Sequence, residues 1–262
     1  MNYSLPFLPK RGSKPRDKGI AMVMDKGLSY READNLIASA GHLIDYIKLG
    51  FGTSIATNGL RDKIALYHEA GIRVYLGGTL FEAFIIRDMY DDFVNLLNKY
   101  DLQTVEVSDG SMKLDHNKKC AYISDLATRF EVLSEVGAKD SEVELKKEDW
   151  IDEMTKELEA GSQLVIAEAR ESGTVGIYTK DGYANTGLIE DIHQQIPENK
   201  ILWEAPAKAQ QAWFIEHFGA HVNLGNIAPH EVIALETLRL GLRGDTFFEF
   251  LPPELKKQYD LR

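Results

Sequence analysis

The sequence predicts a single α/β domain over residues 1–262, folded as a (β/α)₈ barrel of the TIM type. Short apolar runs alternate with amphipathic stretches, and eight such pairs fill about 250 residues, as in barrels of this class. Regular alternation of this kind is typical of a parallel sheet covered by helices. A doubly wound open sheet is the alternative. It usually carries a glycine-rich phosphate loop after the first strand, and MDKGLS (24–29) lacks that fingerprint.

The elements follow from these patterns in chain order. The apolar runs predict strands over residues 20–25, 45–50, 73–78, 104–110, 131–137, 163–170, 201–206 and 221–226. The amphipathic stretches predict helices over residues 29–43, 58–70, 79–100, 117–129, 146–161, 185–196, 207–219 and 229–244. Ser29 and Glu32 have the spacing of a capping box, which supports a helix start at Ser29. Residues 1–18 form a lead-in and residues 248–262 a tail.

Composition excludes several functional classes. No stretch approaches the ~18 apolar residues of a membrane span, and the N-terminus has no signal-like apolar core. The net charge of −11 argues against nucleic acid, whose binding depends on Lys and Arg at phosphates. The single cysteine, Cys120, excludes an intramolecular disulfide and suits a reducing compartment. We therefore expect a cytoplasmic protein that acts on small molecules.

Charged side chains end most of the predicted strands. Because side chains alternate along a strand, one face near the carboxyl ends carries Glu106, Glu135, Glu168 and Glu204. In a barrel this face is the interior, and this end carries the active site. Other polar residues are expected at the same end, namely Asp25, Lys48, Ser108 and Asn223. A structural ion-pair network is the alternative, but burying four carboxylates is costly unless they are paired or bind a metal.

The residue types indicate chemistry on an anionic substrate. Glutamate oxygens suit Mg²⁺, which could stabilise an enolate-like intermediate, so the four glutamates are the candidate metal ligands. Lys139, in the loop after the fifth strand, is the candidate proton donor. Lys48 and Arg170 are candidates for binding a carboxylate or a similar anion.

A phosphate group would bind at the late loops and helix N-termini of such a barrel. The candidates are Lys208 and Gln210 at the start of the seventh helix, and Gly225 and Asn226 after the eighth strand. Lys14, Arg16 and Arg239 fall at the opposite end, where we expect them to close the barrel or to make contacts in a homo-oligomer.

The motifs at these positions resemble those of phosphosulfolactate synthases. They are YIKLGFGTS, YLGGTLFE, VEVSDGS, VLSEVGAK, EARESG, WEAPAKAQQ, VNLGNI and LETLRLGLRGDTF, which together extend from about Gly19 to Phe247. The resemblance implies a (β/α)₈ barrel and Mg²⁺-dependent addition of sulfite to phosphoenolpyruvate, giving (2R)-3-phosphosulfolactate. It also implies that Lys139, which follows the E-V-G motif, is the general acid. The family has two adjacent lysines at this point, whereas this chain has Ala138 before Lys139.

Two alternatives remain open from the sequence. Another Mg²⁺-dependent barrel lyase or aldolase acting on an enolpyruvate or keto acid would use the same carboxylates. A non-enzymatic, stress-associated relative of the family would keep the fold without the chemistry. The complete set of Glu106, Glu135, Lys139, Glu168 and Glu204 favours an enzyme.

Overall fold

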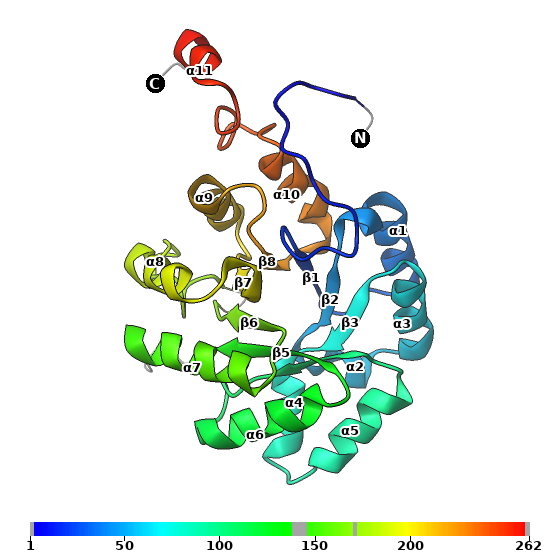
Figure 1. The fold of residues 1–262 in the computed structure, drawn as a ribbon. Coiled ribbons are helices and arrows are strands. Elements are labelled where there is room, and N and C mark those ends of the chain that lie inside the picture. The colour runs from blue at the N-terminus through cyan, green and yellow to red at the C-terminus, as the bar shows by residue number, and fades with distance from the viewer. Residues whose placement is uncertain (1–2, 138–145, 170–171, 260–262) are drawn as a thin grey trace.

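Eight parallel strands curl into a nearly closed barrel (Figure 1), which confirms the predicted fold class. The computed structural model describes residues 3–137, 146–169 and 172–259. The strands are β1 (Ala21–Asp25), β2 (Tyr46–Leu49), β3 (Arg73–Leu76), β4 (Thr104–Val107), β5 (Glu131–Val136), β6 (Leu164–Ala167), β7 (Ile201–Glu204) and β8 (Leu224–Ile227). Their order around the sheet is β3-β2-β1-β8-β7-β6-β5-β4, so β3 and β4 meet at the seam.

Most of the helices cover the outside of the strands, whereas the last helix, near the C-terminus, lies away from the sheet (Figure 1). The bounds of all the described α-helices follow. They are α1 (Tyr30–Ala40), α2 (Thr53–Ala56), α3 (Leu60–Glu69), α4 (Gly78–Ile85), α5 (Tyr90–Lys99), α6 (His116–Ala127), α7 (Lys147–Ala160), α8 (Thr186–Gln195), α9 (Lys208–Phe218), α10 (Val232–Arg239) and α11 (Pro253–Tyr259). The predicted capping box is present, because Ser29 and Glu32 each accept the other's main-chain N–H. Within the described ranges, none of these helices is long and apolar enough to cross a membrane.

The single helix predicted over residues 79–100 is wrong. The chain forms α4 and α5 instead, and Asp88 between them has a left-handed backbone with φ of 57°. Aspartate tolerates this conformation better than most residues, so the chain can turn there. Phe84 then packs on Phe93 across the turn, with ring centroids 5.6 Å apart. The apolar residues that predicted one long helix are therefore buried by two short helices.

The core has two parts because strand side chains alternate. The larger part lies between the sheet and the helices. The smaller part fills the barrel interior and consists of Ile20, Met22, Tyr46, Tyr75, Leu133, Leu164, Ile166 and Leu202. These side chains fill the interior beneath the polar residues at the carboxyl ends of the strands.

Basic residues close the end of the barrel where the strands begin, as predicted. The Lys14 ammonium donates to the main-chain oxygens of Gly41, Ile44 and Ala70. Arg239 is fully buried and donates to main-chain oxygens of the segments that lead into β1 and β8. These cations tie together the segments that lead into β1, β2 and β8.

Candidate active site

Four glutamates lie inside the barrel near the carboxyl ends of β4 to β7. In the sheet registers Glu106 faces Leu133 and Glu135 faces Ile166, so both share the face of the interior core. Glu168 follows β6 directly and Glu204 ends β7. Each of the four side chains is at most 1% exposed. The predicted inward placement of all four is confirmed.

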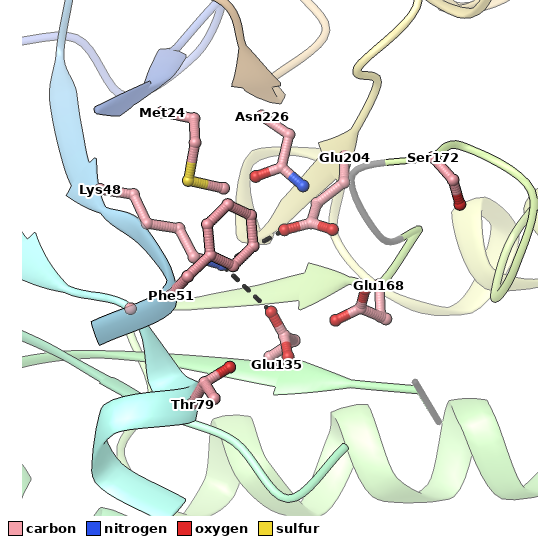
Figure 2. Close-up of a pocket in the computed structure, with 10 residues that line it drawn as sticks. Met24, Lys48, Phe51, Thr79, Glu135, Glu168, Ser172, Glu204 and Asn226 are labelled. Atoms are coloured by element: carbon pink, nitrogen blue, oxygen red, sulfur yellow. Dashed lines mark hydrogen bonds and ion pairs between the residues drawn. The ribbon is translucent and has the colours of Figure 1, made fainter. Parts of the chain in front are cut away.

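Lys48 of β2 reaches into this group of carboxylates (Figure 2). Its Nζ lies 3.0 Å from Glu106, 3.2 Å from Glu135 and 3.4 Å from Glu204. Burial by itself would lower the pKa of Lys48, but the three glutamates outweigh burial and raise this pKa well above its ordinary value. The three carboxylates therefore favour the charged form of Lys48.

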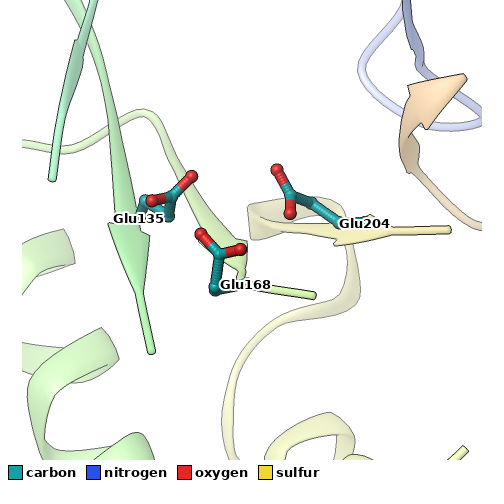
Figure 3. A group of neighbouring side chains, drawn as sticks. All are labelled: Glu135, Glu168 and Glu204. Carbon is teal, nitrogen blue, oxygen red and sulfur yellow. The ribbon is translucent and has the colours of Figure 1, made fainter. Parts of the chain in front are cut away.

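Glu135, Glu168 and Glu204 converge on one point (Figure 3). One carboxylate oxygen from each residue lies within 4.8 Å of the others. Two oxygens bound to the same Mg²⁺ at about 2.1 Å each can be no more than about 4.2 Å apart, so a small inward movement of the three side chains is enough to bring all of them within reach of one ion. The side chains are buried, and carboxylate oxygens are the ligands that hard divalent cations prefer. The donor set therefore fits such a cation.

The environment of Glu204 shows how strongly these charges interact. Burial raises the pKa of Glu204 to about 7, and the neighbouring Glu135 and Glu106 add to this effect while Lys48 opposes it. The main-chain N–H of Ala169 donates to Glu204 Oε2 at 3.1 Å and holds the side chain in place. Near neutral pH this carboxyl can therefore exist in either protonation state before a cation binds.

A cavity of about 400 Å³ opens above this cluster (Figure 2). Among the described residues, it is lined by Met24, Lys48, Phe51, Gly77, Thr79, Glu135, Glu168, Ser172, Glu204 and Asn226. The sequence reasoning missed Met24, Phe51, Gly77, Thr79 and Ser172. Gly77 and Thr79 follow β3 and Phe51 follows β2, so the rule that the loops after barrel strands form the site would have found them.

Asn226 is the predicted late-loop residue that lines the cavity. It lies in β8 with a left-handed φ of 57°, and its buried Oδ1 has no hydrogen-bond partner among the described residues. Its neighbour Gly225 lies deeper in the barrel, beside the interior core residues Met22 and Leu202. A Cβ added to Gly225 would come within 2.8 Å of Met22, so this residue makes room for interior packing beneath the cavity.

Asp25 does not join the site, and its predicted placement is corrected. The register of β1 with β2 pairs Met24 with Lys48, so Met24 points inward and Asp25 outward. Asp25 forms an ion pair with Lys63 of α3 at 2.8 Å and accepts the hydroxyl of Tyr67. Both faces of this strand are apolar, so alternation alone did not show which of them is the interior.

Asn223 lies at the opposite end of the barrel, which corrects a second placement. Its side chain accepts the N–H of Ile20 and donates to the carbonyl of Ile201, where β1 and β7 begin. The strand begins at Leu224, later than predicted, and its register with β1 shifts between Ala21 and Val23. The carboxyl end of β8 therefore carries Asn226 in place of Asn223.

Three further residues that the sequence predicted for substrate binding do not line the cavity. Lys208 pairs with Asp245 at 2.6 Å on the surface. Gln210 is buried and donates to the carbonyls of Gly173 and Gly182, which fastens the loop after β6. Ser108 is buried beyond β4 and donates to Glu82 of α4. As placed, these residues support loops around the site. Lys139 and Arg170 lie outside the described residues, so their placement stays a prediction.

The fold and the site define a class of protein: a (β/α)₈-barrel enzyme with a buried cluster of carboxylates suited to a divalent cation. Comparison with known proteins is more specific. The family model described as (2R)-phospho-3-sulfolactate synthase (ComA) matches residues 9–245, and the chain belongs to this family.

Two curated relatives extend over nearly the whole chain. A phosphosulfolactate synthase of Bacillus subtilis (strain 168) is 41% identical over 244 residues, which is 92% of this chain and 97% of the relative. A phosphosulfolactate synthase of Methanocaldococcus jannaschii is 41% identical over 236 residues, covering 88% and 94%. A solved 3-hexulose-6-phosphate synthase from Salmonella typhimurium has a TM-score of 0.54 at 13% identity, over 86% of this chain and 100% of that one, and shows the shared fold alone.

Proposed function

We propose that this enzyme is a phosphosulfolactate synthase that adds sulfite to phosphoenolpyruvate, giving (2R)-3-phosphosulfolactate. The observation that carries the proposal is the buried carboxylate cluster around Lys48, in a chain that matches its family over most of its length. The reaction joins two anions, so it needs concentrated positive charge and no activated serine or cysteine. The open expectations of a homo-oligomer and of a cytoplasmic location stay predictions.

We propose Mg²⁺ as the cofactor, held by Glu135, Glu168 and Glu204. The support is that their carboxylate oxygens lie close to one another and that all three side chains are buried. When bound, Mg²⁺ would supply positive charge against the negative charge that forms as sulfite adds to the substrate. Glu106 has a different position, because it also accepts the N–H of Gly78 at the start of α4. We therefore place it as a partner of Lys48 and remove it from the proposed ligands.

The proposed role of Lys48 is to bind the carboxylate or sulfite anion, which would replace one of its three glutamate contacts. Its raised pKa keeps it charged, and it lines the cavity beside Glu135 and Glu204. Asn226 offers an amide on the cavity wall for a second polar contact. The proton that completes the product is assigned to Lys139 and a further anion contact to Arg170. Both assignments rest on the sequence.

The test is an assay of the purified protein with phosphoenolpyruvate and sulfite, with and without Mg²⁺. We expect phosphosulfolactate to form only when all three are present. Parallel reactions in which other nucleophiles replace sulfite, or a keto acid replaces phosphoenolpyruvate, separate this function from other barrel lyases. Turnover with a different pair, or none with any pair, would refute the proposal.

A further inference from the structure

A second buried lysine lies just outside the barrel, beside the strand that carries Glu135. Lys119 of α6 is fully buried. Its Nζ lies 2.7 Å from Asp109, 2.7 Å from Glu157 and 2.6 Å from the main-chain oxygen of Glu135. An ammonium group has three N–H donors. The three acceptors therefore use the full hydrogen-bonding capacity of Lys119.

The three acceptors come from different elements that meet at β5. Asp109 belongs to the loop after β4, Glu135 to β5 and Glu157 to α7. Glu135 is also the residue whose side chain contacts Lys48 at 3.2 Å inside the barrel. One residue of the carboxylate cluster is thus held by a lysine on each side, through its carboxylate within the barrel and through its carbonyl from outside.

Stability alone does not account for a charged group at this position. Lys119 and Glu157 are both fully buried, and such a pair gains little over well-packed apolar residues because removing two charges from water is costly. An apolar residue at position 119 would pack between α6 and α7 but would leave the Glu135 carbonyl without this donor. What the ammonium provides specifically is a short bond to the strand end that carries Glu135.

We propose that Lys119 is a positioning residue that fixes the carboxyl end of β5 and thereby sets where the Glu135 carboxylate lies in the site. This inference rests on the proposed function, since it assumes that Glu135 binds the cation. Partners behind metal ligands orient those ligands, and losing such a partner typically lowers metal affinity or activity about 10- to 100-fold.

The chain offers a matched control in Lys63. Its side chain is 2% exposed, pairs with Asp25 at 2.8 Å and donates to the carbonyl of Leu28 at 2.8 Å. Lys63 is thus a buried lysine between a helix and a strand end, like Lys119, but among the described residues it contacts Asp25 and Leu28 and none of the cluster glutamates. Loss of either ammonium leaves a buried carboxylate behind, so both variants should destabilise the fold.

The experiment compares Lys119→Met with Lys63→Met in thermal unfolding, in affinity for Mn²⁺ measured by electron paramagnetic resonance, and in kcat and KM. We expect both variants to unfold at lower temperature. Only Lys119→Met should lose metal affinity and kcat, by about 10- to 100-fold, the scale for a lost partner of a metal ligand. If Lys119→Met does not fold, the double variant Lys119→Met/Glu157→Gln removes the buried charge left behind and takes its place.

A folded Lys119 variant with wild-type metal affinity and kcat would overturn the inference, and so would an equal loss in Lys63→Met. Wild-type protein that binds Mn²⁺ without turnover of phosphoenolpyruvate and sulfite would overturn the proposed function instead, and the affinity comparison would still decide the role of Lys119. Wild-type protein that neither binds Mn²⁺ nor turns over would overturn both.

Discussion

At the scale of single residues, the charge of Lys48 bears on which lysine could supply the proton that completes the product. The glutamates around Lys48 keep it protonated, so Lys48 is a poor source of the proton that completes the product. This leaves Lys139, beyond β5, as the predicted donor. A lysine in a less acidic setting can release its proton near neutral pH, as general acid catalysis requires.

We predict that Lys139→Ala lowers kcat roughly a hundredfold or more, the usual scale for losing a positioned general acid. The KM for phosphoenolpyruvate should change little, because Lys48 and the proposed cation remain. Lys139→Arg should fail as well, because guanidinium does not give up a proton near neutral pH. Steady-state kinetics of both variants, with circular dichroism to confirm folding, make the comparison. An active Lys139→Arg variant would show that the lysine supplies only charge.

At the scale of elements, α4 joins the site to the barrel seam. Its first residue, Gly78, donates its N–H to Glu106 of β4, so the helix begins directly on a carboxylate of the site. A Cβ added at Gly78 would lie 2.4 Å from Ser108 Oγ and 2.7 Å from Glu106 Oε1. The close approach of α4 to β4 therefore requires glycine at this position.

We predict that Gly78→Ala lowers the free energy of unfolding by about 1–3 kcal/mol, the range for overpacking a tight site. It should also lower turnover, because Glu106 must move and Lys48 then loses a partner. Gly244→Ala is the control, since a Cβ there meets nothing within 4 Å. Chemical denaturation and kinetics of both variants test this. Equal stability of the two would mean that α4 shifts without cost.

The interface of α6 and α7 should respond to pH through His116. A hydrogen bond to Glu157 raises the pKa of His116, as do the charges of Glu157 and Glu153, while burial and Lys119 oppose the rise. A histidine whose pKa is higher in the folded state stabilises that state fully below its unfolded pKa, and the contribution disappears as pH rises through the folded pKa. His116 therefore contributes a fall in stability as pH rises above about 6.5.

We predict that His116→Gln removes this part of the pH dependence and leaves a flatter stability profile above neutrality. Urea unfolding of wild type and variant from pH 6 to 9 measures the difference, and His217→Gln, on the surface of α9, serves as the control. Parallel profiles for wild type and His116→Gln would show that the Glu157 contact does not favour the charged ring.

At the scale of the whole molecule, the proposed cation site should couple folding to metal binding. Glu135, Glu168 and Glu204 come together only in the folded barrel, so a cation held by them would bind the folded state. A ligand specific to the folded state adds about 2.7 kcal/mol of stability at 100 times its Kd. We predict that Mg²⁺ raises the unfolding temperature and that chelation abolishes turnover without unfolding the chain.

Glu168→Gln is the variant that tests this coupling. It should fold and yet show weaker metal affinity and a smaller Mg²⁺-dependent rise in unfolding temperature, because one of three converging carboxylates is neutral. Calorimetric titration and thermal unfolding make the measurement. Full turnover in excess chelator would instead assign the cluster to another purpose.

The sequence by itself determined the barrel and the cluster of glutamates at the carboxyl ends of its strands. Eight apolar runs could bury their surface only in a parallel sheet covered by helices, and alternation along each strand placed Glu106, Glu135, Glu168 and Glu204 on one face. These features depend on local periodicity, which the chain carries in every segment.

Only the tertiary structure decided which side chains of β1 point into the barrel, where β8 begins and which residues each charged group contacts. Asp25 and Met24 occupy opposite faces of an apolar strand, and the pairing of Met24 with Lys48 selected the inner one. Asn223 and Asn226 are both plausible strand-end residues, and a shifted register separated them. The contact of Lys119 with Glu135 joins a helix to a strand. Registers and contacts between elements are set by packing across the whole barrel, which no local pattern records.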